Sequence, residues 1–301
     1  MKSRQSLKNS AKTVLKLFYI AVLIAGCSSP AAPTYTKESV ENSIQDTAKK
    51  EHNLDCRVRI SGGTLWVYVP VKDIFSPLEK PEKSLERFAL DYNKVEYNEG
   101  GAKDGTLSLG YLVRPIEEKK APGFPYQYNK AVWDGIGNIN RIALRILHDS
   151  GYSRNEKIKF YCLVTADIKN GFEIKQIMYY PDFKKLYYFL IDSHEYQHRT
   201  IQDYNVQPQE IIGDKEGRHL LWEDISMRDF ILKQIEQRVR LKFLKPEVER
   251  TSNIDKEITK AAIHTIKTYG FKDFTRLELD NLSNNKKIVL TKEEVWPDSA
   301  K

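Results

Sequence analysis

The sequence predicts an α+β fold in which an antiparallel sheet is built from units of one helix followed by a β-hairpin. Apolar residues recur at helical spacing in three segments, and each such segment precedes two short β-prone runs around a tight turn. These units cover residues 40–69, 132–180 and 254–291, and their unequal spacing argues against a solenoid of stacked repeats. We therefore expect one globular α+β domain over residues 37–301.

The first unit shows the pattern most clearly. Val40 and Ile44 fall on one side of a helix. The stretch CRVRISGGTLWVYVPV follows, in which apolar residues alternate with arginines up to Gly62-Gly63, a pair that suits a two-residue hairpin turn. Asn170-Gly171 takes the place of this turn in the second unit, and an Asn-rich stretch does so in the third.

Residues 71–128 have the least regular pattern of the chain. Within them TLSLGYLV, residues 106–113, predicts an edge strand, whereas the neighbouring Gly-, Pro- and Lys-rich stretches predict loops. The sequence is compatible both with an insertion at 71–128 and with a part of the core. Residues 227–243, by contrast, carry the pattern of an amphipathic helix with a charged, solvated face.

The positive charge of the chain is concentrated at its N-terminus. The net charge is +7, of which residues 1–26 hold +5 because they contain five basic residues and no acid. The remainder carries only +2. A sequence pI near 9 is therefore no footprint of nucleic-acid binding, and we exclude nucleic acid as a partner.

The N-terminus has the pattern of a secretion signal. A basic stretch ends at Lys16, and the apolar run LFYIAVLIAG leads to Cys27. Ten apolar residues are too few to cross a bilayer core, which needs about 20. They suit the apolar region of a signal peptide, which we expect over residues 1–26.

The residues Ile24-Ala25-Gly26-Cys27 resemble the lipobox of bacterial lipoprotein precursors, although that family usually has leucine in place of Ile24. The resemblance covers about the first 30 residues. It implies a diacylglyceryl thioether on Cys27, cleavage before this cysteine, and acylation of the new N-terminus by a chain such as palmitate. Residues 27–36 would form a short lipidated tether to the exported side of the cell membrane. In an organism with two membranes, Ser28 favours the outer one.

Two further cysteines, Cys56 and Cys162, lie in apolar stretches. An exported protein sits where disulfides persist, and two cysteines permit a single pairing. A disulfide between Cys56 and Cys162 and two buried free thiols are equally compatible with the sequence.

The stretch HEYQH, residues 194–198, matches the zinc-binding core of many metallopeptidases. On a helix, His194 and His198 share one face and could both bind a zinc ion, while Glu195 could activate the metal-bound water. An apolar stripe from Phe183 predicts such a helix over residues 182–198. The candidates for a third zinc ligand are Glu210, Glu216, His219 and Glu223.

Several features weigh against zinc at HEYQH. Arg199 follows the second histidine directly. Its guanidinium group would repel a zinc ion at the histidines unless the side chain turned away. The glycine and third histidine of the extended metzincin motif are missing from the following residues. The apolar run LYYFLI also reads as a buried strand that ends in a turn at Asp192-Ser193, and the two histidines would then share no helix face.

The remaining motifs give no catalytic assignment. The sequence contains no G-x-S-x-G, Walker loop or G-x-G-x-x-G motif. Four tyrosines crowd one region, where core packing is the favoured interpretation and a groove for glycan or peptide is the alternative: Tyr179, Tyr180, Tyr187 and Tyr188.

We therefore expect a lipid-anchored cell-envelope lipoprotein with a non-catalytic binding or structural role and no cofactor. Its partners would be the membrane, through the lipid on Cys27, and an envelope protein or glycan. The alternative function is a zinc-dependent envelope metallopeptidase that uses His194 and His198 as ligands and Glu195 as the base.

Overall fold

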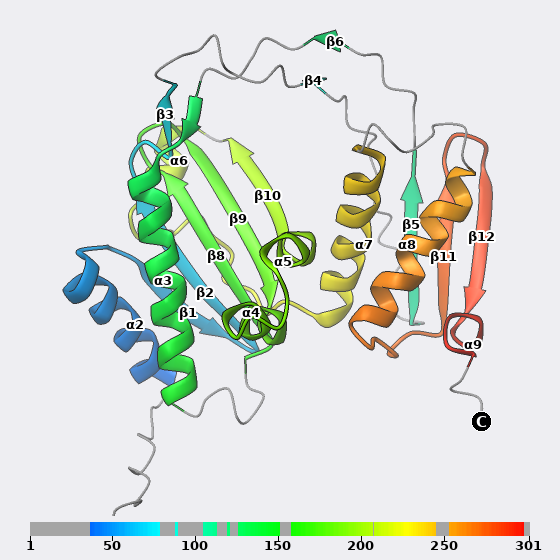
Figure 1. Ribbon diagram of the computed structural model, residues 1–301, viewed down its shortest axis with the longest axis horizontal. Coiled ribbons are helices and arrows are strands. Elements are labelled where there is room, and N and C mark those ends of the chain that lie inside the picture. Colours follow the sequence, from blue (N-terminus) through cyan, green and yellow to red (C-terminus); the bar gives the residue numbers. More distant parts are fainter. Residues whose placement is uncertain are drawn as a thin grey trace, which may run out of the picture.

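The chain folds around two β-sheets (Figure 1). The computed structural model describes residues 37–78, 88–89, 105–112, 119–120, 126–150, 158–206, 208–244 and 253–297. The expected signal peptide, lipobox and tether therefore lie outside the described residues. No helix in these described ranges is both long and apolar enough to span a membrane.

The larger sheet has five strands in the order β1-β2-β8-β9-β10. Two helices, α2 (Lys37–His52) and α3 (Lys130–Asp149), lie together on one of its faces (Figure 1). The strands are β1 (Arg57–Ser61), β2 (Thr64–Val71), β8 (Phe160–Asp167), β9 (Phe172–Tyr179) and β10 (Ile201–Val206).

The smaller sheet has three strands in the order β12-β11-β5. Its core is shared with α7 (Met227–Leu244), α8 (Ile254–Thr268) and α9 (Lys292–Val295). The strands are β5 (Thr106–Tyr111), β11 (Arg276–Asn281) and β12 (Lys286–Thr291). Because Leu107, Leu109 and Tyr111 of the predicted edge strand are fully buried in this core, residues 106–111 are part of it.

Short elements complete the described fold. They are β3 (Phe75–Pro77) paired with β7 (Tyr126–Tyr128), β4 (Phe88–Ala89) paired with β6 (Lys119–Lys120), and the helices α4 (Tyr180–Tyr187), α5 (Ser193–Arg199) and α6 (Gln209–Ile212).

The α+β class and the three helix–hairpin units are confirmed, but the prediction of an antiparallel sheet is wrong. Strands β2 and β8 run parallel, with Thr64 opposite Phe160, and β5 runs parallel to β11. The physical reason is that α3 lies between β2 and β8 in sequence. A helical crossover returns the chain to the starting end of the sheet, so that the next strand points the same way.

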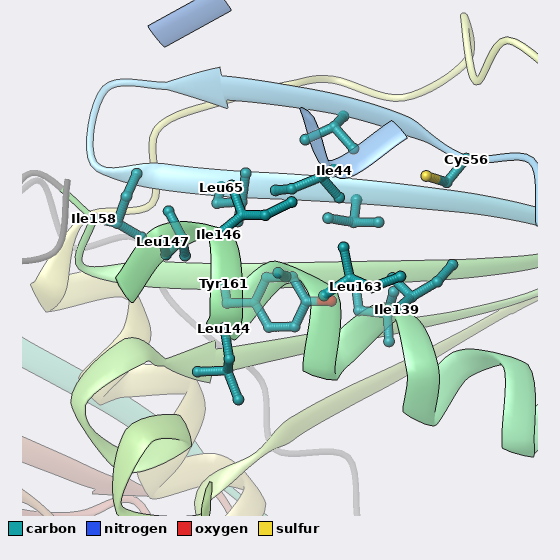
Figure 2. Close-up of a cluster of buried hydrophobic side chains, with 14 of the residues drawn as sticks. Ile44, Cys56, Leu65, Ile139, Leu144, Ile146, Leu147, Ile158, Tyr161 and Leu163 are labelled. Carbon is teal, nitrogen blue, oxygen red and sulfur yellow. The ribbon is translucent and has the colours of Figure 1, made fainter. Parts of the chain in front are cut away.

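The larger sheet separates two apolar cores. The core under α2 and α3 includes Ile44, Ile139 and Tyr161 (Figure 2). Cys56 belongs to this core, whereas Cys162 belongs to the core on the opposite face. Both are free thiols, and burial raises the pKa of Cys56 to about 12 and also raises that of Cys162.

Helix α7 lies between the two sheets and contacts both (Figure 1). Its apolar face packs into the core of the smaller sheet, while the Phe230 ring packs against Phe160 of the larger one at a tilt of 45°, with 5.1 Å between the ring centroids. Two buried glutamines meet the start of the edge strand β10. Gln234 Nε2 donates to the Arg199 carbonyl at 2.7 Å, and Gln237 accepts from the Gln202 N–H at 3.1 Å while it donates to the Thr200 carbonyl. These contacts cap backbone groups that an edge strand otherwise exposes.

The segment 213–226 crosses the other face of the larger sheet and is fastened to the β1–β2 hairpin. The Asp224 carboxylate accepts from the Gly63 N–H at 2.8 Å and from the Thr64 hydroxyl at 3.0 Å. Trp66 Nε1 donates to the Glu223 carbonyl at 2.8 Å. The hairpin turn is therefore held by a carboxylate more than 150 residues away.

Gly62→Ala is expected to destabilise the domain by about 2–4 kcal/mol, measured by chemical denaturation. Gly62 has φ +55°, and an added Cβ would lie 2.1 Å from the Asp224 carboxylate, so the hydrogen bonds of Asp224 would be displaced. Gly137→Ala is the control. Gly137 lies within α3, a Cβ added there meets no neighbouring atom, and replacing a helical glycine with alanine should raise the free energy of unfolding by up to about 1 kcal/mol. Equal effects of the two substitutions would contradict this account of the hairpin.

Candidate functional site

The HEYQH stretch lies on a helix of its own, so both the expected continuous helix over 182–198 and the alternative strand are wrong. Helix α4 ends at Tyr187 and α5 begins at Ser193. Asp192, which was considered as part of a strand-ending turn, instead caps α5 by accepting from the Glu195 N–H at 2.7 Å. The capping side chain and the left-handed backbone at Phe189 (φ 56°) explain the interruption, because each begins or ends a helix locally.

Helix α5 brings the two histidines together. The Nε2 atoms of His194 and His198 are 3.1 Å apart, and the ring centroids are separated by 4.6 Å. Two nitrogen ligands of one tetrahedral zinc ion lie about 3.3 Å apart when each bond is about 2.0–2.1 Å. The distance fits two ligands of one metal ion, and it equally fits a hydrogen bond between the two ring nitrogens.

The carboxylate of Glu195 does not face this histidine pair as a free base. It accepts from Arg199 Nε at 2.6 Å and lies 3.8 Å from Arg238 Nη2 on α7. Partial burial alone would raise the pKa of Glu195, but the hydrogen bond and charge of Arg199 together with the charge of Arg238 lower it. Glu195 is therefore held as an anion in an ion pair.

Arg199, the residue that the sequence marks as unfavourable beside zinc, turns toward α4. Its Nη1 atom donates to Asp182 Oδ1 at 3.1 Å, and the Asp182 side chain is almost fully buried. Lys185 also contacts this carboxylate at 3.0 Å. The ion cluster fastens α5 to α4 and α7, which is a structural role for the end of the HEYQHR stretch.

Two of the four candidate third zinc ligands, Glu216 and His219, have other side-chain partners. Within the described ranges, no group of three His, Cys, Asp or Glu side chains is arranged to hold a metal ion. Glu216 forms a two-point ion pair with Arg57 at 2.6 and 2.5 Å, and His219 is bonded to Glu173. Glu210 lies on the exposed part of α6, and Glu223 lies in the segment that crosses the larger sheet.

The structure adds a cleft that the sequence does not predict, between strands β9 and β10 and the segment 219–225. Its volume is about 400 Å³. The floor is apolar and the rim carries charges of both signs. Its lining includes Trp66, Ile177, Ile201 and Phe230 on the floor and Lys175, Lys233, Glu223 and Asp229 on the rim.

A largely buried pair of titratable side chains lies in the wall of this cleft. His219 Nε2 is 2.8 Å from Glu173 Oε2, and the Nδ1 atom of His219 has no hydrogen-bond partner among the described residues. The two residues are 46 positions apart in the sequence, and only the placement of segment 213–226 over β9 brings them together. The sequence offers one local signal for Glu173, which is an acidic residue within a predicted strand.

The four tyrosines of the crowded region do not share one groove. Tyr180 is buried in the core under α2 and α3, and Tyr179 packs against Phe230 on the opposite face. Tyr187 and Tyr188 instead are half exposed at the end of α4. The prediction of core packing is therefore confirmed for the first pair alone.

The end of α4 has a Schellman motif with an unusual residue. The Leu190 N–H donates to the Lys185 carbonyl and the Phe189 N–H to the Leu186 carbonyl, with Phe189 at φ 56°. This left-handed position is usually taken by glycine, because a Cβ there is unfavourable by about 1–2 kcal/mol. The backbone thus holds a bulky apolar residue in a conformation that it disfavours.

Comparison with known proteins gives no match: no protein-family model, no curated protein and no solved structure is detectably similar to this chain. The sequence motifs and the geometry of the described residues therefore carry the functional argument.

Proposed function

We propose that the chain is a lipid-anchored cell-envelope protein with a non-catalytic binding role at the membrane surface. The anchoring part rests on the order of a basic run, an apolar run and the residues Ile24-Ala25-Gly26-Cys27. Cys27 would carry the diacylglyceryl group, and its amino group would be acylated. Two or more acyl chains give stable anchoring where one chain gives only marginal binding.

The binding role is supported by one observation, the cleft beside β9 and β10. Its volume of about 400 Å³ falls within the range of small-ligand sites, which also combine an apolar floor with a few polar groups. A segment of an envelope protein or a glycan fits this chemistry, because aromatic and aliphatic side chains contact its apolar parts and the rim charges pair with its polar groups. The domain would act on the exported side of the cell membrane, and on the outer membrane in an organism with two.

Cys27→Ser is expected to abolish lipid attachment and to shift the protein from the membrane fraction to the soluble fraction, because the thioether forms on the Cys27 sulfur. The measurement is intact-protein mass together with fractionation of cells that express the full chain. Ser28→Ala is the matched control and should leave both readouts unchanged. A wild-type mass without acyl chains would contradict the proposed anchor.

The second candidate function is a zinc-dependent envelope metallopeptidase, and the specific observation in its favour is the 3.1 Å separation of the two Nε2 atoms of His194 and His198. For this function Glu195 would have to leave its ion pair with Arg199 in order to activate water. Arg199 would then keep its ion pair with Asp182 and lose the one with Glu195. We therefore rank this function second.

Metal content distinguishes the two functions. Residues 28–301 contain the whole described fold, and we expect this chain, purified without a His-tag or chelator, to hold metal at background level by elemental analysis. His194→Ala should give the same value. About one zinc per chain that is lost in His194→Ala would instead support the peptidase, and proteolysis abolished by Glu195→Gln would then establish it.

A further inference from the structure

Four consecutive apolar side chains project from the turn after α4. The exposed fractions are 50% for Tyr187, 52% for Tyr188, 94% for Phe189 and 72% for Leu190. We call residues 187–190 the aromatic tip. Single exposed apolar residues are ordinary on protein surfaces, but a contiguous set usually marks an interaction site.

The backbone conformation at the end of α4 holds these side chains in their exposed positions. Phe189 occupies the left-handed position of the Schellman motif, and its hydrogen bonds to the last turn of α4 fix the tip on a rigid element. Strain that surrounding structure maintains is commonly found where a segment has a function. The aromatic tip is therefore held in a defined conformation by the end of α4.

Helix α4, which carries the tip, lies at the same end of the larger sheet as the start of α2 (Figure 1). Glu41 in the first turns of α2 accepts from the Ile60 N–H, near the β1–β2 turn. The register then places Thr64 beside Phe160 and Phe160 beside Tyr179, after which α4 begins. Strands β1 and β9 are three strand spacings apart, which is about 15 Å.

In the proposed anchoring, the lipid on Cys27 is tethered to the start of α2 at this end of the sheet. Residues 27–36 connect Cys27 to α2, and ten residues reach at most about 35 Å even when fully extended. With this anchor the bilayer surface would lie within this distance of the start of α2, and α4, which carries the aromatic tip, begins at the same end of the larger sheet.

We propose that the aromatic tip inserts into the interfacial region of the lipid bilayer and forms a second membrane contact beside the lipid on Cys27. The inference rests on the proposed anchoring for the orientation of the domain. Tyrosine and phenylalanine favour the membrane–water interface, and a second contact adds to one set of acyl chains. Lys184 precedes the tip and lies over the Tyr180 ring, where its ammonium group is available to an anionic lipid headgroup, whereas Lys185 is paired with Asp182.

The test uses the full acylated chain with a fluorophore attached to a new cysteine at the tip, in the variant Phe189→Cys. The native thiols do not compete, because Cys56 and Cys162 are buried. The protein is reconstituted into vesicles of phosphatidylethanolamine and phosphatidylglycerol that contain nitroxide-labelled lipid. We expect strong quenching of the label at 189 by the nitroxide.

Val206→Cys is the matched control. Val206 is 75% exposed and lies at the opposite end of the larger sheet, because it pairs with Phe172, which pairs with Asp167 beside Val71. Its label should not be quenched. Equal quenching at 189 and 206, or none at either, would overturn the proposal. So would a tip label that is already shielded without vesicles in a concentration-dependent manner, because a second copy of the chain would then cover the tip.

A second measurement separates this inference from the proposed anchor. The chain of residues 28–301 has no lipid, so its binding to the same vesicles depends on the tip alone. Phe189→Gly removes the apolar side chain and suits the left-handed backbone, so this variant stays folded. Its partition onto vesicles should be weaker by about tenfold or more, whereas Val206→Gly should be unchanged. If wild-type 28–301 does not bind, the tip proposal fails and the anchor is unaffected. If the full chain is not acylated but 28–301 binds through Phe189, the anchor fails and the tip remains a membrane contact that does not depend on the lipid.

Discussion

The contact between α7 and the start of β10 is the constraint on which the arrangement of the rest depends. Gln234 and Gln237 are buried amide side chains that satisfy three backbone groups of residues 199–202. Buried backbone groups without partners are unfavourable, so the position of α7 along the strand is fixed by hydrogen bonding as well as by apolar packing. Because α7 also carries the core of the smaller sheet, this contact joins the two sheets.

The same contact organises the region of HEYQH. Helix α5 directly precedes β10, and its last residue, Arg199, forms ion pairs with Asp182 of α4 and with Glu195. Arg238 of α7 lies near the same Glu195 carboxylate. The Asp192 cap and the left-handed backbone at Phe189 leave α4 and α5 as two short helices with a turn between them. The turn has nowhere to bury its apolar residues, so Phe189 and its neighbours project from the end of the sheet. The HEYQHR stretch thus contributes Glu195 and Arg199 to a structural ion cluster, and the exposed aromatic tip lies just before it in the sequence.

Local pattern predicted the elements well and their assembly poorly. The three helix–hairpin units and the edge strand at 106–111 follow from periodicity and turn residues, which are properties of neighbouring positions. Parallel pairing of β2 with β8 depends on the crossover through α3, and the Glu173–His219 pair joins positions that no local pattern relates. The apolar spacing from Phe183 predicts one helix across residues 188–192, where the structure has a helix end. Apolar spacing carries no information about the left-handed backbone at Phe189.

The free energy of unfolding of Gln237→Ala tests the contact between α7 and β10 most directly. The control is Gln197→Ala, which removes an exposed glutamine of α5. Gln237→Ala leaves the Gln202 N–H and the Thr200 carbonyl without partners. We predict a loss of about 2–4 kcal/mol, with faster amide exchange at Gln202 and in α7, and a loss under about 0.5 kcal/mol for the control. Equal stabilities of the two variants, with unchanged exchange, would contradict the claim that this contact joins the sheets.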